Sequence, residues 1–191
     1  MVVFAHFKQK NLKGFSTKLV TWHDEYKHRS YGFDVHIKEF FQEFQDYFHQ
    51  IGDSKHENQV SQLSVYYETA ARGINPLRLE KIKTGRRENI WIAAFHCLSI
   101  LSEILQQALE DVNHTIDEAK EMLSQLILSA IQNQLLTQDH LNQVGDYTKI
   151  EVIWNDLKQH QQISLVDRKL RLSITNNDIY ILIDEIFSSI K

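Results

Sequence analysis

The sequence has 191 residues and a mass of 22.5 kDa, a length that suits one compact domain. Its 42% hydrophobic and 24% charged residues are typical of a globular protein, and one proline and six glycines exclude a collagen-like chain. A single cysteine, Cys97, excludes an intramolecular disulfide and a zinc site built on cysteines. The formal net charge of −4 gives no global reason to bind nucleic acid or an anionic membrane. We expect a single domain over residues 1–191 without a membrane contact.

The N-terminal sequence lacks the features of a signal peptide. Its apolar start ends at Ala5, and lysines follow the apolar residues instead of preceding them. The longest apolar stretch, residues 90–105, is interrupted by serines and a glutamate and is shorter than the ~20 apolar residues that a membrane helix needs. These features predict a soluble, cytoplasmic protein with a reduced thiol.

In the first half of the chain, apolar residues recur at the spacing of one helix face. They predict helices over residues 15–29, from Asp34 to Gly52, over 58–72, over 76–83 and over 86–112. Asp34 is the expected N-cap of the second of these helices. Asn75 followed by Pro76 is a start signal for the short fourth helix. The helix over 86–112 carries apolar residues on two sides near its middle, which predicts a central, buried position.

The second half contains further helical patterns and one stretch with a different period. Helices are expected over 115–136, 138–144, 147–161 and from the 176–178 cap to the end. The first of these follows a capping box formed by Thr115 and Glu118. Apolar residues alternate with polar ones over residues 170–174, which predicts a β-hairpin within 163–174. The expected fold is an all-α, single-domain bundle of seven or eight helices, with a small β-hairpin near its C-terminal end.

Charge is distributed unevenly along the sequence. Residues 1–95 hold 14 Lys and Arg against 11 Asp and Glu, whereas residues 96–191 hold 7 against 14. Six cations and only one carboxylate, Glu80, lie in the basic segment over residues 72–87, which ends at the expected start of the long helix. Helix N-termini attract anions. The candidate anion-binding residues are Arg78, Lys81, Lys83, Arg86 and Arg87. The alternative is a solvated loop whose cations offset the acidic helices behind it.

Ten histidines raise the question of a metal site. Glu25 and His28 form a Glu-x-x-His pair, which carboxylate-bridged di-iron bundles need twice, together with two further glutamates. The only comparable pairs, Asp53-x-x-His56 and Asp111-x-x-His114, lie at the ends of expected helices. We therefore expect no metal and no cofactor, and Glu25 and His28 are the metal-ligand candidates. The neighbours His23 and Asp24 are similar to the metal dyad of HD-type phosphohydrolases in these two letters only.

Signatures of catalysis are missing from the sequence. It has no Gly-x-Ser-x-Gly elbow, His-Glu-x-x-His pair, EF-hand loop or glycine-rich phosphate loop. His96 and Cys97 are adjacent on a helix, where successive side chains point about 100° apart, so His96 is badly placed to activate the thiol. Cys97 is expected to be a buried structural residue. The chain is therefore expected not to be an enzyme.

The leading hypothesis is a non-enzymatic regulatory or adaptor protein that acts through helix-face protein contacts, as a homodimer or with a protein partner. One alternative is a nucleic-acid-binding regulator that uses the basic segment or a winged-helix-like C-terminal region. In that region the helix over 147–161 would enter the major groove and the hairpin would form the wing, although Glu151 and Asp156 oppose phosphate binding. Its contact residues would be Lys149, Asn155, Lys158, His160, Gln161, Arg168, Lys169 and Arg171. The second alternative is a metal-dependent helical hydrolase or oxidase.

Overall fold

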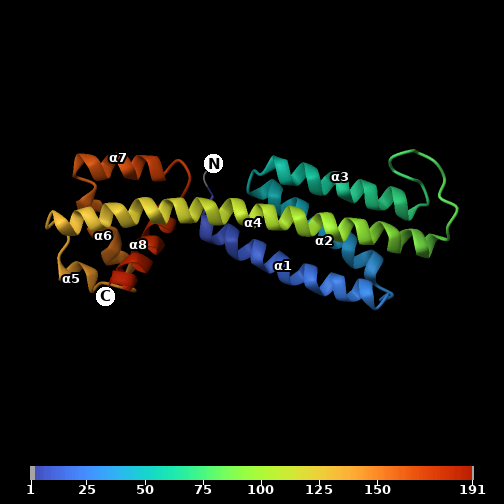
Figure 1. Ribbon diagram of the computed structural model, residues 1–191, viewed down its shortest axis with the longest axis horizontal. Coiled ribbons are helices and arrows are strands. Elements are labelled where there is room, and N and C mark those ends of the chain that lie inside the picture. The colour runs from blue at the N-terminus through green and yellow to red at the C-terminus, as the bar shows by residue number, and fades with distance from the viewer. Residues whose placement is uncertain (1–2, 191) are drawn as a thin grey trace. The chain divides into compact units, whose positions relative to one another are not determined.

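The computed structural model describes residues 3–190, and within them the chain forms eight α-helices and no β-strand (Figure 1). The predicted all-α helical bundle is therefore confirmed. The helices are α1 (Ala5–Lys27), α2 (Phe33–Gln50), α3 (Ser54–Ala71), α4 (Arg86–Gln132), α5 (Gln138–Leu141), α6 (Tyr147–Leu157), α7 (Gln161–Leu170) and α8 (Asn176–Ile190).

Contacts along the chain divide it into two compact units. The N-terminal unit is Lys10–Glu110, and the C-terminal unit is Asp111–Lys191 together with Met1–Gln9. Helix α4 is continuous and contributes its first part to one unit and the remainder to the other. Each unit has its own core, as described below. The expectation of a single domain over residues 1–191 stays a prediction.

The core of the N-terminal unit is built on the aromatic stripe of α2. Seven residues of this helix are buried, among them Phe40, Phe44 and Phe48. From α1, the ring of Phe15 lies 4.8 Å from that of Phe44. From α4, the Trp91 ring stacks on Phe33 at 5.1 Å. The stripe is hydrophobic core, and its burial holds α1, α2 and α4 together.

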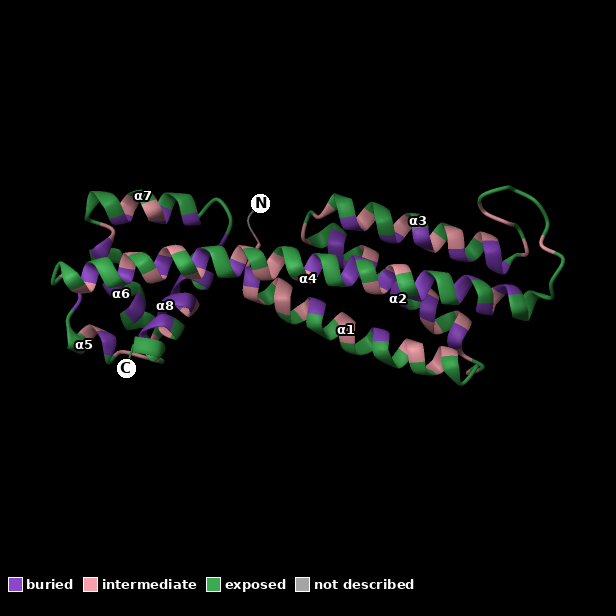
Figure 2. Cartoon of the chain, in the orientation of Figure 1, coloured by how far each residue is buried: buried purple, intermediate pink, exposed green. Residues whose placement is uncertain are grey.

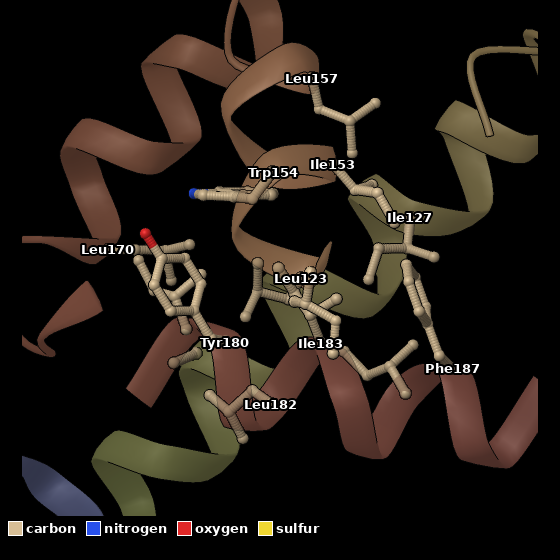
Figure 3. Close-up of a cluster of buried hydrophobic side chains, with 14 of the residues drawn as sticks. Leu123, Ile127, Ile153, Trp154, Leu157, Leu170, Tyr180, Leu182, Ile183 and Phe187 are labelled. Atoms are coloured by element: carbon tan, nitrogen blue, oxygen red, sulfur yellow. The ribbon is translucent and has the colours of Figure 1, made fainter. Parts of the chain in front are cut away.

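The core of the C-terminal unit surrounds Trp154 of α6 (Figure 3). Side chains from α4, α6 and α8 converge there, including Leu123, Ile183 and Phe187. The indole Nε1 of the fully buried Trp154 donates a hydrogen bond of 3.0 Å to Asp167 of α7. This bond attaches α7 to the core, because a buried donor without an acceptor would destabilise the fold.

The hairpin predicted within residues 163–174 is wrong, since residues 161–170 form helix α7. Three residues of α7, namely Ile163, Asp167 and Leu170, are buried, and their spacing of four and three is that of a helix face. The alternation over 170–174 falls instead on the turn that follows the helix. Leu172 is exposed there while Leu170 and Ile174 are buried. The sequence fits both the two-residue period of a strand and the three-to-four-residue period of a helix. Packing against the Trp154 core buries Ile163, Asp167 and Leu170 together, which favours the helix.

The predicted break between residues 112 and 115 does not occur, and α4 continues through it for 47 residues in all. Thr115 lies inside the helix and its Oγ1 donates to the Asp111 carbonyl oxygen at 2.9 Å. The local letters of a capping box are present, but no glycine or proline interrupts the backbone at this point. Burial of Ile116 and Ala119 continues the apolar face into the C-terminal unit.

Other elements also differ from those predicted: α3 begins at Ser54 instead of residue 58, and α6 ends at Leu157 instead of residue 161. Helix α1 begins at Ala5, ten residues before the expected start at residue 15, because Ala5 and Leu12 are buried on its inner face. The N-cap of α2 is Gly32 instead of Asp34. The Asp34 carboxylate accepts hydrogen bonds from Tyr67 at 3.0 Å and from Lys38 at 2.9 Å. The short helix predicted over 76–83 is absent, and a hydrogen-bonded loop replaces it.

Helix α4 contains a stretch that is long and apolar enough, by length and composition alone, to cross a membrane, and 44% of that stretch is buried inside the protein. No other helix among residues 3–190 meets this criterion. Buried core helices of soluble proteins meet the same criterion.

Candidate functional site

The loop between α3 and α4, residues 72–85, consists of two segments that are joined to each other by backbone hydrogen bonds. The Asn75 amide donates to the Glu80 carbonyl and the Ile82 amide donates to the Gly73 carbonyl, both at 2.8 Å. Ile74 and Lys81 form an antiparallel bridge between these two bonds. The chain therefore runs out and back, with residues 76–79 as the tip of the loop. In Figure 1 the loop arches away from the helices before α4 begins.

The side chain of Asn75 starts a helical turn at the tip of the loop, and the backbone conformation of Leu79 ends it. Its Oδ1 accepts hydrogen bonds from the amides of Leu77 at 2.9 Å and Arg78 at 3.1 Å, as a helix N-cap does. The turn then ends at Leu79, whose φ of +56° is left-handed. A non-glycine residue in this conformation costs about 1–2 kcal/mol. The start signal read from the sequence is thus real, but only one turn follows it.

The tip exposes two leucines. Leu77 is 84% exposed and Leu79 is 79% exposed, and the loop around them is largely exposed as well (Figure 2). Both residues lie within the short helix predicted over residues 76–83, and their sequence pattern predicts no role for them. The only signal in the sequence is their alternation with Arg78 and Glu80.

Cations surround these leucines. Arg78 lies between them, Lys81 and Lys83 follow on the returning segment of the loop, and Arg86 and Arg87 begin α4. All five are exposed, and none of them takes part in an ion pair with another residue in the described part of the chain. Glu80 is the only carboxylate between residues 73 and 87. These five cations therefore form a positive surface that only Glu80 offsets within residues 73–87.

The five predicted anion-binding residues do not all reach one cavity. A pocket of about 810 Å³ lies where the loop meets α2, α3 and α4, and only Lys81 and Arg86 of the five line it. Its lining also contains two carboxylates, and these pair with cations of the same lining: Asp34 with Lys38 at 2.9 Å and Glu68 with Arg72 at 3.1 Å. These pairs weaken the attraction of the pocket for a small anion. The cations without an ion pair lie on the projecting loop and in the first turn of α4.

Two residues fix the base of the loop against α4. Gly73 has a φ of +82°, and a Cβ at this position would lie 3.1 Å from the Asn89 side-chain nitrogen. Asn89 is buried, accepts a hydrogen bond from the Thr84 hydroxyl and donates to the Thr84 carbonyl at 3.5 Å. A side chain at position 73 would be strained and would disturb this contact. The base of the loop is therefore held in one arrangement.

The metal-ligand candidates Glu25 and His28 do not face each other. Glu25 Oε2 lies 2.9 Å from Nδ1 of His36, and this hydrogen bond is the main cause that raises the pKa of His36. His28 Nδ1 instead lies 2.8 Å from the backbone carbonyl oxygen of Asp24. Among residues 3–190, no group of three or more His, Cys, Asp and Glu side chains is arranged to hold a metal ion.

The winged-helix alternative loses its wing, because α7 occupies the place of the predicted hairpin. Two of its cations also have intramolecular partners. Lys149 lies 3.4 Å from Asp146, and Arg171 lies 2.7 Å from the buried Asp167. These pairs leave less positive charge for phosphates in the C-terminal unit.

Cys97 is fully buried, and burial raises the pKa of its thiol to about 12. At pH 8 the thiolate fraction is then on the order of 10⁻⁴. We expect the native protein to react with a thiol reagent such as DTNB at least about a hundredfold more slowly than the same chain in guanidinium chloride. Stopped-flow absorbance measures both rates. Equal rates in the two conditions would contradict a buried, structural role.

A second exposed apolar surface lies on the N-terminal half of α4. Phe95 is 66% exposed and Ile92, three residues earlier on the same helix, is 56% exposed. The ring of Tyr26 on α1 lies 6.4 Å from that of Phe95. We call these three residues the α4 patch. The apolar pattern of this helix predicted a central, buried position. Most of its apolar residues are buried against α1, α2 and α3, but Ile92 and Phe95 lie on a strip that these helices leave exposed.

No protein-family model, curated protein or solved structure matches this chain.

Proposed function

We propose that this chain is a non-enzymatic adaptor or regulatory protein of the cytoplasm that acts through a helix face, and that its first partner is a second copy of itself. The observation that carries the proposal is the exposure of Phe95 beside Ile92 on α4. A large aromatic side chain gains most from burial at an interface, at about 25 cal/mol per Å² of apolar area removed from water.

The α4 patch packs against buried aromatic residues of the N-terminal unit, so its side chains are already ordered before a partner binds. Tyr26 contacts Trp91 at 5.6 Å between ring centroids, and Trp91 in turn stacks on Phe33. A patch held by such a core loses little side-chain freedom when it is covered. In a two-fold symmetric dimer the same patch contributes from both subunits, so one exposed Phe and Ile pair is buried twice.

We expect Phe95→Glu to abolish self-association, because the substitution would bury two carboxylates at the centre of a two-fold interface. Light scattering across a range of protein concentrations measures the mass of the wild-type protein and of the variant. Val65→Glu is the matched control, since Val65 is exposed to a similar degree on α3. A wild-type protein that is monomeric at every concentration would contradict self-association.

The nucleic-acid alternative uses the basic segment but leaves its leucines without a role. Proteins that bind single strands place aromatic rings beside their cations, because bases stack on rings. The aliphatic side chains of Leu77 and Leu79 have neither a ring on which a base could stack nor a polar group that could bind a phosphate. The exposed apolar side chains therefore favour a partner that has an apolar component.

A further inference from the structure

We propose that the tip of the α3–α4 loop docks on membranes that contain anionic lipids. Leu77 and Leu79 enter the interface between headgroups and acyl chains, and the cations of the basic segment contact the lipid headgroups. The contact is peripheral and uses the loop alone. It is separate from the α4 patch and adds a location to the function proposed above.

The shape of the loop suits insertion into a flat surface. The two leucines are the most exposed large apolar residues of the loop and lie at its turn, between the two segments that the Asn75–Glu80 and Ile82–Gly73 hydrogen bonds join. Asn75 fixes the turn through its bonds to the backbone amides of Leu77 and Arg78. The leucines are thus presented before any contact forms, and docking requires little further ordering of the backbone.

The charge of the loop complements an anionic surface. Residues 73–87 hold five cations and a single carboxylate, Glu80, and none of the five cations takes part in an ion pair with a described residue. The cations are Arg78, Lys81, Lys83, Arg86 and Arg87. The net charge of −4 for the whole chain predicts no membrane contact. At physiological ionic strength, however, screening confines a surface charge to about 8 Å, so the charge beside the contact matters more than the total. A basic cluster of this kind is attracted to anionic lipids.

The combination of exposed leucines with a cluster of cations distinguishes this surface from an ordinary basic loop. Reversible membrane attachment by one weak signal is marginal, and pairing an apolar element with a polybasic patch makes it stable. A nucleic acid would use the cations and leave the leucines in water. A small anion would use the pocket, where Asp34 and Glu68 oppose it. The lipid surface is the partner that uses both the leucines and the cations.

The test is sedimentation of the full-length protein with phosphatidylcholine vesicles, prepared with and without phosphatidylserine. We expect strong binding only to the vesicles that contain phosphatidylserine, and weaker binding as salt is raised. Leu77→Ser combined with Leu79→Ser should weaken that binding by about tenfold or more. Lys81→Gln combined with Lys83→Gln should weaken it and reduce its dependence on salt. Leu165→Ser, an exposed leucine on α7, is the matched control and should bind like the wild type.

Each other outcome overturns the proposal. Absence of binding to phosphatidylserine vesicles would contradict membrane docking. Equal binding to both vesicle types would contradict the proposed role of the cations. If the double leucine variant binds as strongly as the wild type, the leucines do not insert into the membrane. Binding of duplex DNA that depends on the lysines and not on the leucines identifies a nucleic acid as the partner instead. Phe95→Glu should bind vesicles about as well as the control, which separates this test from that of self-association.

Discussion

Replacement of Phe44 by alanine is expected to lower the free energy of unfolding by about 3–5 kcal/mol, the usual cost of truncating a fully buried phenylalanine. Phe44 has no exposed surface, and its ring lies 4.8 Å from Phe15 of α1 and 4.6 Å from Phe48 of α2. The substitution would leave a cavity where two helices meet, and the packed rings around it relax only in part. Urea denaturation followed by circular dichroism measures the change.

Two further variants make this result specific to burial. Phe44→Leu should cost less than Phe44→Ala because more of the volume remains filled. Tyr31→Ala, at a fully exposed position between α1 and α2, should change stability by no more than about 0.5 kcal/mol. Equal stability of Phe44→Ala and the wild type would show that the aromatic stripe is not the core of this unit.

Replacement of Asp178 by alanine is expected to destabilise the C-terminal unit by about 2–5 kcal/mol. The carboxylate is fully buried and anchors the start of α1 as well as the start of α8. It accepts hydrogen bonds from the amides of Ala5, His6 and Thr175, each at 3.0 Å. It also accepts one from the Thr175 hydroxyl at 2.8 Å and lies 2.7 Å from His6 Nδ1. Without it, these donors would lose their acceptor in a buried site.

Asn177→Ala is the matched control, because Asn177 is exposed and precedes Asp178 on the same helix. It should leave stability within about 0.5 kcal/mol of the wild type. Amide hydrogen exchange adds a local readout. Residues 5–9 should lose protection in Asp178→Ala and keep it in Asn177→Ala. Unchanged protection in both variants would show that the carboxylate does not anchor α1.

The same carboxylate should make stability depend on pH. Burial acts to raise the pKa of Asp178, but the hydrogen bonds from His6, Ala5 and Thr175 outweigh it, so the pKa is lowered overall. A lowered folded-state pKa means that the ionised group stabilises the fold above the ordinary aspartate pKa of about 3.9. This contribution is lost as the pH falls below that value and through the folded-state pKa. The decline in stability on acidification should be smaller in Asp178→Asn.

Several elements could be predicted from the sequence because their patterns are local and strong. The aromatic spacing of α2 and the apolar run of α8 predict helices that the structure contains. Caps and turns were predicted less well, since the same short motif serves several purposes. Thr115 and Glu118 have the letters of a capping box, yet Thr115 lies inside α4. Asn75 and Pro76 have the letters of a helix start, yet one turn is all that follows.

The candidate site also combines features that the sequence predicts with features that depend on the fold. The helical character of the chain and the cluster of cations over residues 72–87 follow from the sequence alone, because periodicity and charge are properties of neighbouring residues. The helix over residues 161–170, the uncovered position of Phe95 and the exposure of Leu77 and Leu79 depend on tertiary contacts. Exposure of an apolar side chain depends on whether a distant segment covers it, and no local pattern contains that information.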